Sequence, residues 1–436
     1  MWSALSTFLA FCQLTLALNI SHATMAPLRK LNFHVPDSKI NEFTSLLSSS
    51  KIGPETWYNN HNNTDFGTTR DWLAKAKDSW LDLDWRNQED RINSFPNFNT
   101  TINDVDIGPI NIHFVGLYSS RRDALPLLFL HGWPGSFLEF LPLLDILKSK
   151  YTTESLPYHV IIPSLPDYGL SGGPVDTELT LEIAARIMNE LMITLGFGSG
   201  YVVQGGDIGS FLARILSATY PQCKAFHSKQ NWPSISGRRP NCTNHQAVNM
   251  LAPSSQEEML TGANITEEES QHVQRMLKFS TTGSSYLLEH GLRPSTIGLV
   301  LSSSPLAMLA WIGEKFLEWP DSRYPLTLDT ILTMVSFYWY TDTFPRSMYP
   351  YRALAGSAAA DELFSVPTSK EKPFGYSVFP AENILLPKAW AEKAYPNLVF
   401  YKRNDKGGHF AALEQPDTFL QNIEEFLAIA RPLIEL

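Results

Sequence analysis

The sequence predicts an α/β protein whose sheet is interrupted by a block of helices and preceded by a helical extension. From residue 109 onward, short apolar segments with strand character alternate with segments of helical periodicity, as is typical of a parallel sheet covered on both faces. The alternation stops over residues 252–365, where helical segments rich in Trp, Leu and Tyr intervene, and then resumes. A helical block between strands indicates a cap over the carboxyl edge of the sheet, where α/β proteins usually bind ligands.

This pattern divides the chain into five segments. They are residues 1–23, a signal peptide or N-terminal anchor; 24–108, the helical extension; 109–251, the first part of the sheet domain; 252–365, the helical cap; and 366–436, the second part of the sheet domain. In the extension, Asp37 can cap a helix that contains Ile40 and Phe43, and Trp72–Trp85 has the spacing of another helix.

The sequence predicts the following strands and helices in the sheet domain. The expected strands are Ile110–Leu117, Leu125–Leu130, Tyr158–Pro163, Tyr201–Gln204, Tyr376–Phe379 and Leu398–Tyr401. The expected helices are Leu179–Leu195, the segment that starts with Ser210–Leu216, and Thr418–Ala430 at the end of the chain. Strands followed directly by helices favour parallel pairing.

Composition narrows the class of protein. The chain has 436 residues, of which 44% are hydrophobic and 18% charged, so one large α/β domain with a cap can bury a sizeable core. The net charge of −10, without a dense Lys/Arg run, argues against a nucleic-acid partner.

The first residues predict a compartment. Met1–Leu18 is largely apolar and Ser21-His22-Ala23 offers a small-residue cleavage site, although no basic residue precedes Arg29. We expect a cleaved secretory signal and a secreted protein. The alternative is a retained anchor in the ER membrane, which is the only membrane contact that the sequence suggests.

Glycosylation sequons and cysteines also bear on the compartment. Asn-x-Ser/Thr sequons begin at Asn19, Asn62, Asn99, Asn241 and Asn264, which supports a route through the ER. After cleavage, Cys223 and Cys242 remain. They form either one disulfide or two buried thiols, and the sequence leaves both open.

The segment Gly205-Gly-Asp207-Ile-Gly209-Ser has the form small-x-nucleophile-x-small between a strand and a helix. This is the nucleophile elbow of α/β-hydrolases, with Asp where most members carry Ser. A turn this tight requires small residues at 205 and 209 to avoid a clash. Taken alone, however, Asp207 is equally well read as an ordinary helix N-cap.

A second loop supplies context for the turn. His131-Gly-Trp133-Pro-Gly135 follows the strand Leu125–Leu130, at the position of the oxyanion-hole loop of this fold. The backbone N–H groups of Trp133 and Ile208 can then donate to an oxyanion. We expect His131 to stabilise the loop rather than to act as a base.

A better base is His409, which lies after the last expected strand in Gly407-Gly-His409-Phe. The chain order of these hydrolases, nucleophile then acid then base, places the orienting acid before His409. Glu382 is favoured because it follows the strand Tyr376–Phe379, while Asp405 and Glu414 are competitors. No pair of histidines has zinc-ligand spacing beside a third ligand.

Several long motifs, in order, resemble the microsomal-type epoxide hydrolase family, particularly its soluble fungal branch. Besides the two loops and the His409 segment, the resemblance includes Asp84-Trp-Arg, Asn93-Ser-Phe-Pro and Ser303-Ser-Pro-Leu-Ala-Met-Leu-Ala-Trp-Ile-Gly-Glu-Lys-Phe. It covers the chain from about Pro27 to the C-terminus. It implies an α/β-hydrolase fold with a helical cap and the family's N-terminal extension, and it makes a homodimer plausible.

The resemblance also assigns roles to residues. It implies that Asp207 is the nucleophile, His409 the base and Glu382 the acid, the last in the context Phe379-Pro-Ala-Glu382. It further implies two cap tyrosines as ring-opening acids, Tyr286 and Tyr351. Tyr349 lies close enough to Tyr351 in the sequence to be its competitor.

The expected reaction converts a small-molecule epoxide and water to a vicinal diol through an ester on Asp207, with no metal or organic cofactor. The alternatives are a haloalkane dehalogenase, which shares an Asp nucleophile on this fold, a relative that opens or cyclises an epoxide without releasing a diol, and a binding protein that lost turnover. One departure from the family pattern is Asp167, where relatives commonly have Gly, and this bears on substrate scope.

Overall fold

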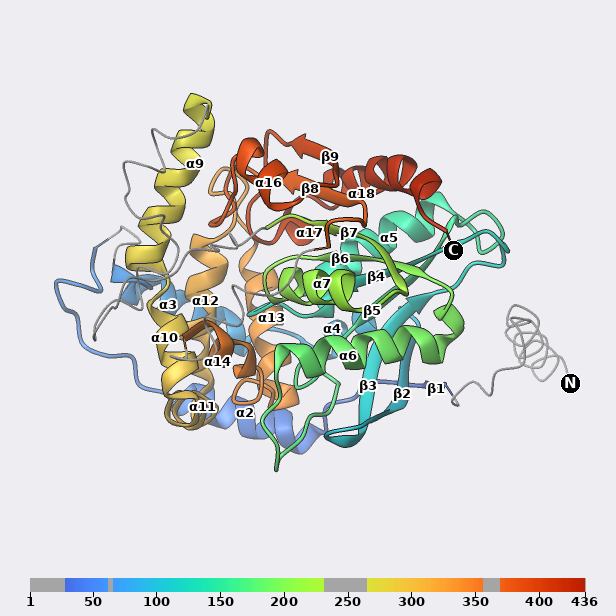
Figure 1. Ribbon diagram of the computed structural model, residues 1–436. Coiled ribbons are helices and arrows are strands. Elements are labelled where there is room, and N and C mark those ends of the chain that lie inside the picture. The colour runs from blue at the N-terminus through green and yellow to red at the C-terminus, as the bar shows by residue number, and fades with distance from the viewer. Residues whose placement is uncertain (1–27, 62–65, 231–264, 356–368, 436) are drawn as a thin grey trace, which may run out of the picture.

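The structure, a computed structural model, describes residues 28–61, 66–230, 265–355 and 369–435. Within them, nine strands form one sheet in the order β1-β2-β3-β5-β4-β6-β7-β8-β9 (Figure 1). The strands are β1 (Arg29–Lys30), β2 (Asn97–Asp104), β3 (Gly108–Leu117), β4 (Leu125–Leu130), β5 (Tyr158–Pro163), β6 (Tyr201–Gly205), β7 (Cys223–Ser228), β8 (Phe374–Val378) and β9 (Leu398–Arg403).

The sheet is mixed rather than wholly parallel. From β5 through β4, β6, β7 and β8 to β9, every neighbouring pair is parallel, as the alternation of strands and helices predicts. The first three strands instead pair antiparallel, and β3 meets β5 antiparallel. β2 and β3 are joined by a short turn, so they need no crossover helix and can form a hairpin.

Helices cover both faces of the parallel part, and all six residues of β4 are buried. Figure 1 shows α5 and α18 together on one side of the strands and α6 with α7 on the other. The helices of the sheet domain are α5 (Leu141–Lys150), α6 (Leu181–Met192), α7 (Ile208–Thr219), α16 (Lys388–Ala394), α17 (Ala411–Glu414) and α18 (Pro416–Ala430).

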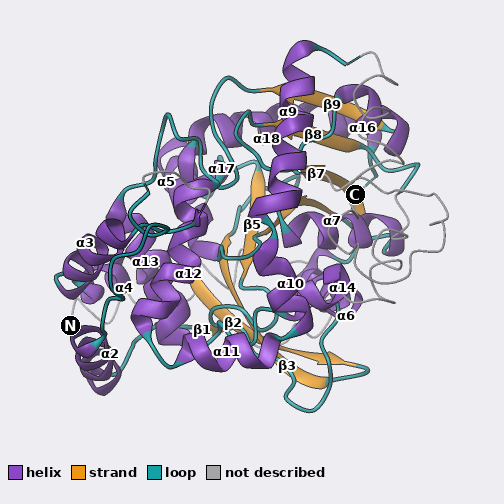
Figure 2. Ribbon diagram, turned by 90° about the vertical axis from the view of Figure 1, so that its left-hand side faces the viewer, coloured by secondary structure: helices purple, strands orange, loops and turns teal. Residues whose placement is uncertain are grey.

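The expected helical cap lies between β7 and β8. Its described helices are α9 (Glu267–Lys278), α10 (Ser285–Leu292), α11 (Pro294–Ser302), α12 (Pro305–Glu318), α13 (Leu328–Thr341) and α14 (Tyr349–Ala355). Figure 2 views the molecule from the side of the cap, with α10, α12 and α14 in front of the strands. The cap therefore faces one edge of the sheet, as the sequence predicts.

The N-terminal extension contains α2 (Asp37–Ser49), α3 (Arg70–Leu81) and α4 (Trp85–Asn93). It packs on the cap, where the indole N–H of Trp80 donates to Ser336 Oγ at 2.7 Å. Phe43 lies edge-on to Trp80, with ring centroids 4.8 Å apart. The extension thus holds the outer side of α12 and α13.

Two expectations for local structure are wrong, and some strands were not predicted. The single helix Trp72–Trp85 is two helices, because α3 ends at Leu81 and Asp84 caps α4 by accepting the N–H groups of Arg86 and Asn87. Asp37 is the first residue of α2 and makes no side-chain cap. The sequence reading also missed β2 and β7; β7 is interrupted by a Lys and a His, which hid its strand character.

Most features that bear on the compartment lie outside the described residues. They are the leader, Cys242 and the sequons at Asn19, Asn62, Asn241 and Asn264. Asn99 lies inside β2, and its side-chain oxygen is buried, which is a poor position for a glycan. Cys223 carries a free, buried thiol. Within the described ranges, no single helix has the length and apolarity to cross a membrane, although the bent pair α11 and α12 passes that test jointly.

Candidate active site

Asp207 stands at the sharp turn between β6 and α7 with a φ of 51°, a left-handed value that a side chain tolerates only under constraint. The turn leaves no room for side chains on its flanks. A Cβ on Gly205 would lie 2.0 Å from Gly209 O, and one on Gly209 would lie 2.2 Å from Leu130 O. The two glycines are therefore steric requirements of the turn.

The Asp207 carboxylate does not cap α7. It accepts the N–H of Trp133 at 2.8 Å, and from α7 it takes only the N–H of Ile208, the first residue, rather than the N2 or N3 groups that a capping side chain bonds. Burial raises the pKa of Asp207, while His409 and these two N–H groups oppose the rise. The geometry thus favours the nucleophile reading of the turn over the helix-cap reading.

The loop that carries Trp133 is fixed by buried hydrogen bonds. His131 Nε2 accepts the N–H of Leu165 at 3.1 Å, and His131 Nδ1 lies 3.0 Å from Gly132 O, so the ring carries its hydrogen on Nδ1. Burial lowers the pKa of His131 to about 4, which keeps the ring neutral. Tyr338 donates its hydroxyl to Gly135 O at 2.8 Å. His131 therefore acts on the loop, as expected.

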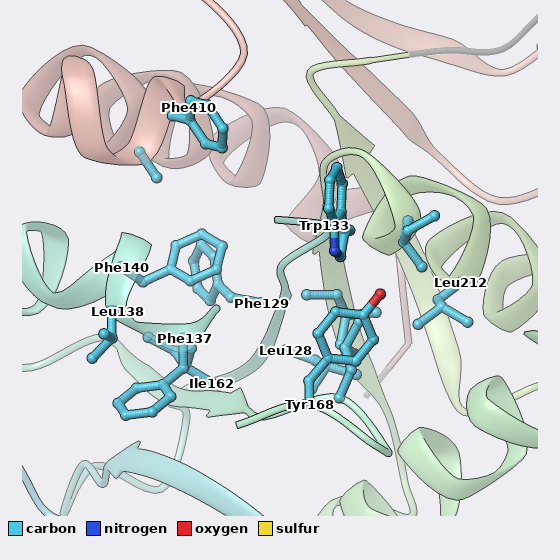
Figure 3. Close-up of a cluster of buried hydrophobic side chains, with 14 of the residues drawn as sticks. Leu128, Phe129, Trp133, Phe137, Leu138, Phe140, Ile162, Tyr168, Leu212 and Phe410 are labelled. Atoms are coloured by element: carbon cyan, nitrogen blue, oxygen red, sulfur yellow. The ribbon is translucent and has the colours of Figure 1, made fainter. Parts of the chain in front are cut away.

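Aromatic side chains pack around this loop. Phe129, Phe137 and Phe140 gather on one side of Trp133 and Leu212 lies on the other (Figure 3). Trp133 is fully buried. Such packing excludes water and strengthens the electrostatic interactions of the carboxylate.

His409 faces both acidic residues of the site. Its Nδ1 lies 2.9 Å from Glu382 Oε1, and its Nε2 lies 3.7 Å from Asp207 Oδ2. Burial would raise the pKa of Glu382, but His409 and Lys229 outweigh it and lower that pKa to about 2. Glu382 is therefore ionised and orients the imidazole.

The competing acids lie elsewhere. Asp405 is exposed, and its main-chain oxygen accepts from Arg323. Glu414 accepts the main-chain N–H groups of Asp321 and Phe410, each at 2.8 Å. Its carboxyl group therefore braces the loop that carries His409 without a hydrogen bond to the ring.

The cap brings two tyrosines to the site. The rings of Tyr286 and Tyr351 lie 5.6 Å apart, at 5.1 Å and 5.8 Å from the Trp133 ring. Burial, reinforced by Asp207, raises the pKa of Tyr286 and that of Tyr351 well above the ordinary value, so both phenols stay protonated. Tyr349 instead packs on Tyr168, with ring centroids 6.2 Å apart.

Comparisons with known proteins agree with this site. A family model described as "Epoxide hydrolase N terminus" matches residues 28–140, and one described as "alpha/beta hydrolase fold" matches residues 126–247. A putative epoxide hydrolase of Dothistroma septosporum is 40% identical over 94% of this chain and 92% of its own. The chain belongs to the epoxide hydrolase family. It is also 30% identical to Epoxide hydrolase 1 of Sus scrofa, over 92% of this chain and 89% of that protein.

Solved structures support the same assignment. The epoxide hydrolase of Aspergillus niger superposes with a TM-score of 0.80 at 40% identity, over 94% of this chain and 99% of that one. The juvenile hormone epoxide hydrolase of the silkworm Bombyx mori shares the fold, with a TM-score of 0.78 at 24% identity over 94% and 96% of the two chains. This protein is thus an epoxide hydrolase, an enzyme that acts on small-molecule epoxides.

Two residues of the epoxide hydrolase site escaped the sequence reading. Lys229 Nζ lies 3.3 Å from Glu382 Oε2 and also donates to the main-chain oxygen of His409. Gln230 Oε1 accepts the N–H of Asp207 at 2.8 Å. Both follow β7, and recognition of that strand would have placed them at the carboxyl edge of the sheet.

Asp167, the departure from the family pattern noted in the sequence, adopts a φ of 62°. Its carboxyl group is buried and lies 3.3 Å from Arg346 Nη1 of the cap, and burial raises the pKa of Asp167 to about 6. The loop thus links the sheet domain to the cap. The part of the chain that the structure describes contains no group of three or more His, Cys, Asp or Glu side chains able to hold a metal ion.

Proposed function

We propose that this epoxide hydrolase works through a covalent ester on Asp207. The observation that carries the proposal is the position of one buried carboxylate between two backbone N–H groups, the His409 imidazole and two protonated cap tyrosines. The geometry provides a nucleophile, a base and acids within one site, which are the parts that ester formation and hydrolysis require.

In the first half-reaction, an oxygen of Asp207 attacks one epoxide carbon and the bond between that carbon and the ring oxygen breaks. The released oxygen takes a proton from Tyr286 or Tyr351. The products are a hydroxyalkyl ester and a tyrosinate. Because Asp207 lies in a water-poor site, its attack does not compete with a full hydration shell.

In the second half-reaction, His409 takes a proton from a water molecule whose oxygen attacks the ester carbonyl. The tetrahedral oxyanion receives the N–H groups of Trp133 and Ile208. Collapse releases the diol oxygen and restores the Asp207 carboxyl group. Of the two protons then present, one goes to the diol and one to the tyrosinate, so that epoxide plus water gives diol.

A single turnover in oxygen-18 water tests the ester. The diol oxygen then comes from Asp207, so we expect the label in the peptide that contains Asp207 and unlabelled diol. Label in the diol of the first turnover would contradict the ester and indicate direct attack by water. A product that stays unlabelled after many turnovers would indicate the epoxide-opening or cyclising alternative.

Asp207→Asn provides the matching variant. With styrene oxide, the unmodified enzyme should gain the mass of the substrate, and Asp207→Asn should not. Asp405→Asn is a suitable control, since this exposed carboxylate lies near the His409 loop without contacting the ring. Turnover of a haloalkane with release of halide, in the absence of epoxide turnover, would favour the dehalogenase alternative.

We further propose that residues 1–23 direct the protein into the secretory pathway, because an apolar segment precedes a small-residue cleavage site there. Expression in a eukaryotic host followed by N-terminal sequencing tests this. A secreted chain that begins near Thr24 and carries glycans at Asn62, Asn241 or Asn264 is expected. A membrane-bound chain that begins at Met1 would support the retained anchor, and light scattering of the pure protein would test the homodimer.

A further inference from the structure

A small cavity of about 10 Å³ lies behind the Asp207 carboxylate, on its sheet side. By the same measure, this is about the size that one water molecule requires. The charged and polar side chains that line it include Asp207, His409, Lys229, Glu139, Gln204 and His131. The mechanism above uses the first two and places the third on Glu382, but it gives no role to Glu139 or Gln204.

Glu139 is fixed beside the oxyanion loop. It lies on the short helix Phe137–Phe140, and a Cβ on Gly135 would fall 1.4 Å from its Oε1. The second glycine of the loop is therefore needed to admit this carboxyl group, just as a Cβ on Gly132 would fall 2.2 Å from Asp207 Oδ1. Burial raises the pKa of Glu139 to about 7, against the opposing charges of Lys229 and His409.

Gln204 approaches the same cavity from β6. Its side chain is buried, and both amide atoms have no hydrogen-bond partner within the described ranges. A buried amide is normally paired, by protein or by ordered water. Because Gln204 lines the cavity, a water molecule there can pair with it.

Apolar side chains close the remaining wall. Phe140 and Phe410 line the cavity, and Figure 3 shows them on the same side of the Trp133 loop. A small site that combines polar groups with apolar side chains restricts the orientations of a bound water molecule.

We propose that Glu139 and Gln204 hold the water molecule that attacks the ester, and present it to His409. The inference rests on the ester mechanism proposed above. It commits these two side chains to the second half-reaction alone. The epoxide carbon reacts on the cap side of Asp207, where the tyrosines lie, and does not meet them.

Rapid-quench mass measurement with styrene oxide tests this, because it separates ester formation from ester decay. In Glu139→Gln, which preserves the size of the side chain, we expect ester decay to slow by about 10-fold to 100-fold. Ester formation should stay within about twofold of the unmodified enzyme, so the ester should accumulate. Equal slowing of both steps, or no change in either, would overturn the proposal.

Gln204→Met removes both amide atoms at nearly constant volume and should give the same selective loss. It carries the test if Glu139→Gln fails to fold, which circular dichroism would reveal. Glu89→Gln is the matched control, since Glu89 is a buried carboxyl of the N-terminal extension that accepts from Val35 and Trp85 and lies outside the cavity. That variant should alter thermal stability without separating the two steps.

The ester on Asp207 and the water site can be refuted separately. If no variant and no condition yields an ester on Asp207, the ester mechanism itself is wrong. If an ester forms and decays at the unmodified rate in both Glu139→Gln and Gln204→Met, the ester mechanism stands and the water site is refuted.

Discussion

The sheet side and the cap side of the site differ in how their polar atoms are satisfied. On the sheet side, apart from the unpaired amide of Gln204, the Asp207 carboxylate has two backbone donors and Glu382 binds His409, Lys229 and the N–H of Asn383. On the cap side, several polar atoms are buried and lack a hydrogen-bond partner in the described part of the chain. These are Tyr351 Oη, His290 Nδ1, Trp133 Nε1 and Trp319 Nε1.

The unpaired atoms on the cap side are hydrogen-bond donors. His290 Nε2 accepts the indole N–H of Trp311 at 2.9 Å, so the neutral ring carries its hydrogen on Nδ1. Burial and the nearby Lys315 lower the pKa of His290 to about 3, which keeps it neutral. A buried donor without a partner costs about 1–3 kcal/mol. Under the proposed mechanism, the sheet side thus holds its own donors for ester hydrolysis, whereas the phenol of Tyr351, unpaired within the described residues, is available to the epoxide oxygen.

We expect the largest effect from His409→Gln, which removes the base on the sheet side and leaves the cap side unchanged. Ester formation should persist, because the nucleophile and the tyrosines remain. Ester hydrolysis should fall by about 10³-fold or more, because His409 is the base of the proposed second half-reaction. Rapid mixing followed by intact-mass measurement should show nearly complete, long-lived modification of the enzyme.

The control for this variant is Asp405→Asn on the same loop, which should form and release ester at the unmodified rates. If His409→Gln lost ester formation as strongly as hydrolysis, the imidazole would be needed for the nucleophile as well. The sheet side would then not be separable from ring opening.

Changes on the cap side should have the opposite selectivity. Tyr286→Phe or Tyr351→Phe removes one acid and should slow ester formation by about 10-fold to 100-fold, while the other tyrosine still donates. The double variant should lose ring opening altogether. Stopped-flow quenching of tryptophan fluorescence can follow this step, because Trp133 contacts both rings.

Tyr349→Phe distinguishes the two candidates for the second acid. Its hydroxyl oxygen is buried like that of Tyr351, but its ring packs on Tyr168 rather than on Tyr286. Ester formation should therefore be unchanged. A loss in Tyr349→Phe equal to that in Tyr351→Phe would reverse the assignment.

The sequence predicted the sheet side better than the cap side, for a physical reason. Asp207 and Trp133 lie on tight turns that only glycine-rich motifs allow, so the glycines required for steric reasons can be recognised in the sequence. Tyr286 and Tyr351 lie on ordinary helices, α10 and α14, where a buried tyrosine has no local signature. They came only from the family resemblance.

Contacts between distant segments were the least predictable. Lys229 reaches Glu382 across 153 positions of the sequence, and Glu139 reaches the site only because Gly135 leaves space for it. Neither Lys229 nor Glu139 lies at a sequence spacing from its partner that would predict the contact. The fold was predictable from alternating strands and helices, whereas β2 was missed because it is mostly polar and lies in the segment that was expected to be helical.

Lys229→Met should weaken the sheet side without removing a reacting group. Glu382 has a pKa of about 2 in the folded protein, below its usual value, because His409 and Lys229 oppose the effect of burial. Its contribution to stability is present above about pH 4.5 and is lost as the pH falls toward 2. Without Lys229, the pKa of Glu382 should rise, and stability should be lost at a higher pH.

We also expect Lys229→Met to lower the free energy of unfolding at pH 7 by about 3 kcal/mol, because one partner of a buried ion pair is removed. Urea denaturation at pH 7 and at pH 4 measures both effects. Lys402→Met is the control, since that lysine pairs with Glu425 at the surface and should change stability by less than about 1 kcal/mol. Equal losses in the two variants would contradict the special role of Lys229.

The smallest effect is expected where the two sides meet, at Asp167→Gly. Glycine relieves the left-handed backbone at φ 62°, but it loses the contact with Arg346 and gains freedom in the unfolded chain. These terms nearly cancel, so stability should change by less than about 1 kcal/mol at pH 7.

For Asp167→Gly, the pH dependence of the stability change is more informative than its magnitude at pH 7. Burial raises the pKa of Asp167 to about 6, so the stabilisation by its protonated form is complete below about pH 4 and is lost as the pH rises through 6. The glycine variant lacks this loss. Its melting temperature relative to the unmodified enzyme should therefore increase between pH 4 and pH 7. A constant difference would mean that Arg346 keeps the carboxylate ionised throughout, and that the cap is tied to the sheet domain by a permanent ion pair.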